Sequence, residues 1–191
     1  AWILATPGAV RPDPATGRNS WPLTETARRD VVLLAHALPR PISARIAAGS
    51  TRALQQTAVL LQMRLGGFVA VDPRLDSPAR PPVWLEAYEE LRSHWLRGAP
   101  VVGWEARESV VARVLEAGRA AAHRHRGGTP VLVTGHLAAV AVIAALTGAE
   151  PGDDLAPRPA AFLVDPSGGR VTRVFPTVPR FEAPVQRDAS G

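Results

Sequence analysis

The sequence predicts an α/β protein, built as a three-layer α/β/α sandwich with a mostly parallel central sheet. Short apolar runs bounded by turn residues alternate with longer stretches whose apolar residues recur at helical spacing. The chain has 191 residues, a length that suits one domain of ordinary size. It shows no internal repeat. We therefore expect a single domain over residues 1–175, followed by a proline-rich tail over residues 176–191.

Six stretches have the composition of short strands. They are apolar or mix apolar and polar residues, and glycine, proline or other turn formers bound them. The last two flank the turn at residues 165–169 and therefore predict a hairpin. The expected strands cover residues 2–5, 42–48, 68–71, 130–134, 160–164 and 170–175.

Five stretches predict helices, the first four of them with one apolar face. Thr24 is placed to cap the first helix, and Glu25 adds negative charge to its first turn. The last helix is apolar nearly all round, so it should be buried. The expected helices cover residues 25–38, 51–65, 83–96, 105–126 and 137–146.

The charge of the chain gives little support for nucleic-acid binding. The formal net charge is +5, and all 22 basic residues are arginine. These arginines are spread from Arg11 to Arg187 and form no long basic run. We therefore expect no nucleic-acid partner.

Other functional classes are also disfavoured. The chain has no cysteine, which excludes a disulfide framework and cysteine metal ligands. No apolar run approaches the roughly 18 residues of a membrane span, and residues 1–5 lack the length and basic flank of a signal peptide. We expect a cytoplasmic protein with no membrane contact, no metal and no cofactor.

One histidine lies both at the carboxyl end of a predicted strand and at the start of a predicted helix, and both positions suit ligand binding. Residues 130–134 predict a strand that breaks at Gly135, and His136 then begins an apolar helix. Open α/β sheets bind ligands at the carboxyl ends of their strands. A helix N-terminus favours an anion through its free N–H groups. If the chain has an active centre, His136 should belong to it.

Five pieces of the chain stand out together, at residues 2–8, 22–25, 52–58, 105–114 and 131–136. In order and in approximate spacing, they resemble the histidine phosphatase superfamily, also called phosphoglycerate mutase-like. They run from residue 2 to about residue 148, and the helix start and the strand-histidine piece are the most specific. The resemblance implies the α/β/α sandwich of that family.

The resemblance also implies a chemistry. In that family a histidine in an Arg-His-Gly turn after the first strand attacks a phosphoryl group. Arginines and a second histidine hold the phosphate, and a glutamate protonates the leaving group. His136 matches the second histidine. The turn itself is Thr6-Pro7-Gly8, so a proline stands at the nucleophile's position. We therefore expect a degenerate member, a pseudophosphatase without phosphohistidine chemistry.

Two further motifs depart from the family pattern. Counting back from residues 57–58, the second arginine position falls on Ala53, and Arg52 is its neighbour. One residue turns a helical side chain by about 100°, so Arg52 serves only if the local register shifts. The usual acid position falls on Ser77, where the adjacent Asp76 is the available substitute.

These residues predict a polar pocket that is less cationic than the family's. A neutral or singly charged small molecule fits such a pocket better than a doubly charged phosphate. We expect His136 to act as general acid or base, with Asp76 or Glu105 as its partner. Glu105 can instead stabilise a helix dipole, Asp76 can be a turn residue, and His136 can be structural. The predicted ligand-contacting residues are Thr6, Pro7, Gly8, Ser50, Arg52 and Trp104.

Three functions are compatible with the sequence. The first is a repurposed small-molecule enzyme, such as an isomerase, cyclase or hydrolase of a biosynthetic intermediate, that uses His136 for proton transfer. The second is a non-catalytic protein that binds a ligand or a protein. The third is a residual phosphomonoesterase. A small-molecule ligand is expected, and a homo-oligomer stays open.

Overall fold

A computed structural model describes most of the chain. The expected tail at 176–191 lies outside the described residues, as do residues 83–86 of the third expected helix and residues 125–126 of the fourth. The described ranges are 1–13, 15–39, 42–81, 87–124, 127–152, 155–156, 158–165 and 167–175.

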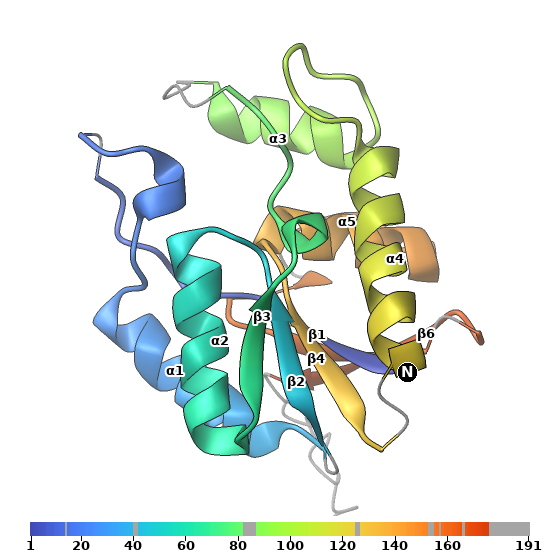
Figure 1. Ribbon diagram of the computed structural model, residues 1–191. Helices are drawn as coiled ribbons and strands as arrows, with labels where there is room; N and C mark the ends of the chain where they lie inside the picture. The colour runs from blue at the N-terminus through green and yellow to red at the C-terminus, as the bar shows by residue number, and fades with distance from the viewer. Residues whose placement is uncertain are drawn as a thin grey trace, which may run out of the picture.

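The described residues form a six-stranded sheet with the strand order β3-β2-β4-β1-β5-β6 (Figure 1). Three of the five neighbouring pairs are parallel, and the pairs β1–β5 and β5–β6 are antiparallel. The mostly parallel sheet and the final hairpin are therefore confirmed. The strands are β1 (Trp2–Ala5), β2 (Ile42–Ala48), β3 (Phe68–Val71), β4 (Thr129–Val133), β5 (Ala161–Asp165) and β6 (Arg170–Phe175).

Helices cover both faces of this sheet, which confirms the three layers. α1 and α2 pack on one face, α4 and α5 pack on the other, and α3 lies beyond the sheet next to α5 (Figure 1). Two short 3-10 turns, η1 (Arg18–Ser20) and η2 (Pro73–Leu75), lie between the expected strands and helices. The helices are α1 (Glu25–Ala37), α2 (Arg52–Leu65), α3 (Tyr88–Leu96), α4 (Arg107–Arg124) and α5 (His136–Thr147).

Local signals in the sequence account for two helices in detail. Thr24 caps α1, because its hydroxyl oxygen accepts a hydrogen bond from the Ala27 N–H at 3.1 Å. In α5 every residue from His136 to Ala144 is buried, as expected for a helix that is apolar all round.

Two apolar clusters fill the spaces between the layers. Alternate residues of a strand point to opposite faces, so Leu4 and Leu132 pack under α4 and α5 while Ile3 and Val131 pack under α1 and α2. Nearly all of these side chains have no solvent contact. The burial of both faces holds the central strands rigidly and fixes the positions of the loops that follow them.

Candidate functional site

The carboxyl ends of three parallel strands meet at one edge of the sheet. Ala5 of β1 and Ala48 of β2 both pair with Val133 of β4. The segments that begin at Thr6, Gly49 and Thr134 therefore start side by side. This is the edge where α/β sheets bind ligands, and it carries most of the site residues expected from the sequence.

The turn after β1 is buried and tightly packed. The Thr6 hydroxyl oxygen accepts a hydrogen bond from the Ala160 N–H at 2.8 Å, and the Thr6 N–H donates to the Ala160 carbonyl at 2.8 Å. A Cβ atom added to Gly8 would lie 2.4 Å from the Ala27 Cβ of α1. Glycine is therefore needed at this contact. Pro7, between Thr6 and Gly8, is buried and has no polar side-chain atom.

His136 is the first residue of α5, directly after Gly135 at the helix N-cap. Only 9% of it is exposed. Its Nε2 lies 3.5 Å from Nη2 of Arg92 on α3. The positive end of the α5 dipole and the guanidinium thus act at the same place, and both favour negative charge there.

Arg92 brings a cation that the sequence-based expectation omitted. It is 6% exposed, and its Nη1 lies 3.2 Å from the Glu89 carboxylate, which is 78% exposed. A signal was present in the sequence, because Tyr88, Arg92 and Trp95 follow the i, i+4, i+7 spacing of one helix face. An arginine within an apolar stripe marks a charge that the fold takes inside.

Asp76 and Ser50, which were both expected in the site, lie in contact with each other. The Asp76 Oδ1 accepts hydrogen bonds from the Ser50 N–H at 2.5 Å and from the Ser50 hydroxyl at 3.0 Å, and Oδ2 lies 2.9 Å from the same hydroxyl. This carboxylate therefore joins the segment after β2 to the segment after η2.

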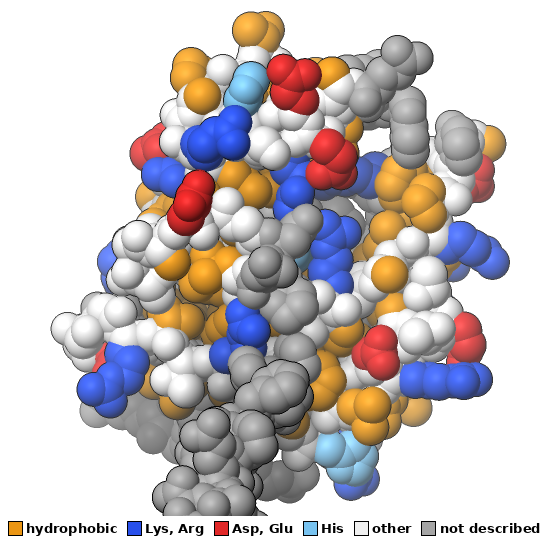
Figure 2. Space-filling view, turned by 180° about the vertical axis from the view of Figure 1, so that it is seen from behind, with side chains coloured by type: hydrophobic (Ala, Val, Ile, Leu, Met, Phe, Trp, Pro, Cys, Tyr) orange, Lys and Arg blue, Asp and Glu red, His pale blue; other side chains and the backbone are white. Residues whose placement is uncertain are grey.

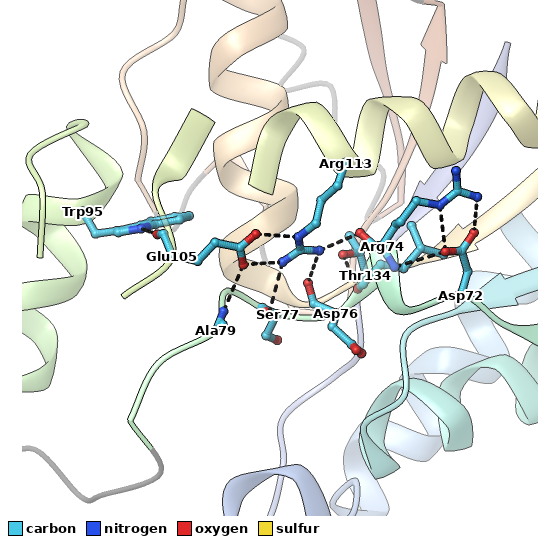
Figure 3. A network of polar contacts seen from close by, with 10 residues as sticks. Asp72, Arg74, Asp76, Ser77, Ala79, Trp95, Glu105, Arg113 and Thr134 are labelled. Atoms are coloured by element: carbon cyan, nitrogen blue, oxygen red, sulfur yellow. Dashed lines mark hydrogen bonds and ion pairs between the residues drawn. The ribbon is translucent and has the colours of Figure 1, made fainter. Parts of the chain in front are cut away.

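Glu105 is held by an arginine of α4. Its carboxylate accepts hydrogen bonds from Arg113 at 2.8 and 2.9 Å and from the Ala79 N–H at 3.1 Å (Figure 3). The Arg113 hydrogen bonds lower the pKa of Glu105, with a smaller contribution from the Ala79 N–H, and they outweigh the effect of burial. Glu105 therefore stays ionised near neutral pH and is a poor proton donor.

Arg113 extends this network along the edge of the sheet. Its Nη1 donates to the carbonyls of Arg74 at 2.6 Å and Asp76 at 2.8 Å, and its Nη2 donates to the carbonyl of Ser77 at 3.3 Å. Figure 3 shows the Asp76 carboxylate pointing away from Glu105. The two carboxylates expected to assist His136 are thus engaged by Arg113 and Ser50.

Two of the expected residues, Arg52 and Trp104, make contacts of different kinds. Arg52 begins α2, is exposed, and its Nη1 lies 3.5 Å from the Ser20 carbonyl of η1. Ala53 keeps the inward position, with 7% exposure, so no register shift carries Arg52 inward. Trp104 stacks on Tyr88, with ring centroids 5.9 Å apart. It also lies 6.3 Å from the Trp95 ring.

Comparison with known proteins identifies the family. A sequence profile of the histidine phosphatase superfamily (branch 1) matches residues 11–156. The chain belongs to the histidine phosphatase superfamily. No curated protein matches it. Membership in the superfamily confirms the resemblance that the five sequence pieces indicated, whereas the roles of individual site residues stay predictions.

Solved structures share the histidine phosphatase fold at low sequence identity. YhfR of Bacillus stearothermophilus is 21% identical, with a TM-score of 0.67 over 93% of this chain and 98% of its own. A structure described as mycobacterial hydrolase 1 is 22% identical, with a TM-score of 0.63 over 90% and 95% of the two chains. A mycobacterial glucosyl-3-phosphoglycerate phosphatase in complex with inorganic phosphate is 21% identical, with a TM-score of 0.60 over 90% and 94%.

The described parts of this superfamily member offer no cluster of three or more histidine or acidic side chains arranged to hold a metal ion. No helix within the same ranges is long and apolar enough to cross a membrane. On the face seen in Figure 2 the arginine side chains are scattered among apolar and acidic ones.

Proposed function

We propose that the chain is a non-hydrolytic histidine phosphatase homologue that binds the oxyanion group of a small molecule at His136 and Arg92. The main support is the 3.5 Å approach of the Arg92 guanidinium to the His136 ring at the start of α5. Such a protein keeps the oxyanion-binding part of phosphatase chemistry and omits its covalent part.

The omission of the covalent step rests on the turn after β1. A phosphoryl transfer through the enzyme needs a side chain with a lone pair placed in line with the leaving group. Pro7 has no such atom. The neighbouring Thr6 hydroxyl is fully buried and bound to the Ala160 N–H. A phosphoenzyme is therefore not expected at this turn.

Three physical features favour an oxyanion beside His136. Arg92 supplies a cation with fork-shaped donor geometry, the α5 N-terminus supplies a positive dipole end, and low exposure strengthens both. With Arg92 included, the site is more cationic than the sequence indicated. The similar mycobacterial phosphatase in complex with inorganic phosphate makes phosphate a suitable first probe.

A second candidate is the repurposed enzyme in which His136 moves protons. The burial of His136 at a ligand-binding edge favours it, because a histidine there can meet a bound substrate. Glu105 is paired with Arg113 and Asp76 with Ser50. Proton transfer would therefore depend on His136 without help from either carboxylate.

Calorimetric titration with inorganic phosphate tests the first proposal. The wild type should bind phosphate, and Arg92→Gln and His136→Asn should each weaken binding by roughly tenfold or more, because each removes a charged or polar donor. Arg97→Gln and His94→Asn are matched controls, since both residues are exposed near the end of α3. They should leave the affinity unchanged. A wild type that binds no phosphate contradicts the proposal.

Turnover assays separate the candidate functions. With p-nitrophenyl phosphate we expect no release of nitrophenolate and no phosphate adduct in the intact-protein mass. Hydrolysis that is lost in His136→Asn would instead establish the residual phosphomonoesterase and overturn the non-hydrolytic assignment. A reaction of a bound organic ligand that is lost in the same variant would favour the proton-transfer enzyme.

A further inference from the structure

Arg80 lies in an aromatic cluster beside α3, outside the contacts proposed for His136. Its guanidinium carbon lies 4.3 Å from the centre of the Tyr88 ring and 5.0 Å from the centre of the Trp104 ring. The two rings are stacked, with an interplanar angle of 26°. Arg80 therefore contacts both members of an aromatic pair.

The Nη1 atom of Arg80 is buried and has no hydrogen-bond partner within the described residues. Two other partly buried arginines differ sharply. Arg74 donates to two carboxylates, and Arg113 donates to one carboxylate and three carbonyls. A charged donor that is buried without an acceptor costs free energy. A missing acceptor at Arg80 therefore needs an explanation.

Stacking prepares this arginine to receive an anion. Aromatic faces attract a guanidinium through cation–π contact and hold its plane, so its N–H groups can donate only along the edge. Carboxylate and phosphate oxygens match this fork in a bidentate arrangement. The backbone at Arg80 is also anchored, because the preceding Ala79 N–H donates to Glu105.

Tyr88 and Arg92 lie four residues apart on α3, so they occupy the same face about one helical turn from each other. The acceptor position at Arg80 is therefore near the first oxyanion position but has its own residues. We propose that Arg80, stacked on Tyr88 and Trp104, is a second oxyanion-binding position for a carboxylate or phosphate group of a small molecule. This inference does not depend on the one drawn for His136.

The decisive titration uses a variant that lacks the oxyanion position proposed at His136 and Arg92. In the variant Arg92→Gln/His136→Asn, inorganic phosphate and benzoate are titrated separately by calorimetry, and tryptophan fluorescence reports on the nearby rings. The background should still bind at least one of the two anions. Adding Arg80→Gln should weaken that binding by roughly tenfold or more, and adding Arg97→Gln should not. Phosphate binding alone identifies a phosphate position, and benzoate binding identifies a carboxylate position.

Equal affinity with and without Arg80→Gln overturns the proposal. If the background variant does not fold, Arg80→Gln in the wild type should weaken or remove an anion-binding event that Arg97→Gln leaves intact. A purely structural role for Arg80 predicts a different result. Arg80→Gln would then lower the melting temperature without ligand and leave the stabilisation by anions unchanged, which also contradicts the proposal.

Discussion

The carboxylate of Glu105 is held by the guanidinium of Arg113 through two hydrogen bonds of 2.8 and 2.9 Å. The Glu105 carbonyl accepts a further hydrogen bond from Trp95 Nε1 at 2.6 Å. Glu105 therefore connects α4 to α3, the helix that carries Arg92. These contacts give Glu105 a structural role that the sequence did not predict, while its expected acid–base role stays a prediction.

The first prediction is that Glu105→Gln destabilises the fold. The neutral amide loses the charge of the ion pair and presents an N–H₂ group to the Arg113 donors. The free energy of unfolding should fall by about 1–3 kcal/mol, measured by urea denaturation. Glu108→Gln is the control, because Glu108 is 70% exposed beside Arg107. Its effect should stay within about 0.5 kcal/mol. Equal effects would show that the Glu105 pair adds nothing.

The second prediction concerns acid. Arg113 lowers the pKa of Glu105, and Arg74 lowers the pKa of Asp72 through its side-chain hydrogen bonds. The unfolded chain then binds more protons than the folded chain between the two sets of pKa values, so stability rises with pH there. The stability that these two carboxylates contribute should be fully present above their unfolded pKa values, which are near 4. It should decline as pH falls below about 5.

Urea unfolding at a series of pH values measures this decline. The double variant Asp72→Asn/Glu105→Gln should be less stable at neutral pH but lose less stability on acidification than the wild type. Parallel curves for the two proteins would mean that neither carboxylate contributes to the acid sensitivity.

Local patterns in the sequence were sufficient for most of the fold. The apolar run after Gly135 predicted a buried helix, and α5 is buried from His136 to Ala144. The start of α4 was harder to predict from the sequence. Its helix begins at Arg107, two residues later than expected, because the Glu105 N–H donates to the Ala79 carbonyl and the Glu105 carbonyl accepts from Trp95. Those partners are tertiary, so helical spacing could not reveal them.

The site was predictable only where it depends on local order. His136 follows a strand and starts a helix, and both facts are visible in the chain. Its contact with Arg92 joins residues 44 positions apart and depends on how α3 packs next to α5. The pairing of Asp76 with Ser50 depends in the same way on the parallel alignment of β2 and β3. Composition and periodicity carry no information about such distances.

The third prediction concerns the contact of Gly118 in α4 with Trp2 in β1. A Cβ at residue 118 would lie 2.4 Å from the Trp2 ring, which is 1% exposed and cannot move freely. Alanine favours a helix over glycine by about 1 kcal/mol, whereas overpacking costs about 1–3 kcal/mol. The steric term should win, and Gly118→Ala should lower the melting temperature. In a Trp2→Phe background, which removes part of the ring, the same substitution should cost less. An equal cost in both backgrounds would exclude this contact as the cause.

The fourth prediction assigns a structural role to Thr6, the first residue of the Thr6-Pro7-Gly8 turn. Thr6→Val keeps the shape of the side chain but leaves the Ala160 N–H without its acceptor in a fully buried place. The free energy of unfolding should fall by about 1–3 kcal/mol. The Ala160 amide should exchange faster with solvent, measured by NMR. Thr6→Ser retains the hydroxyl and should keep that amide protected. Because phosphate is expected to bind at His136 and Arg92, both variants should bind it with wild-type affinity once folded. A selective loss of phosphate binding in Thr6→Val would instead place the Thr6 hydroxyl in the ligand site, as the sequence first indicated.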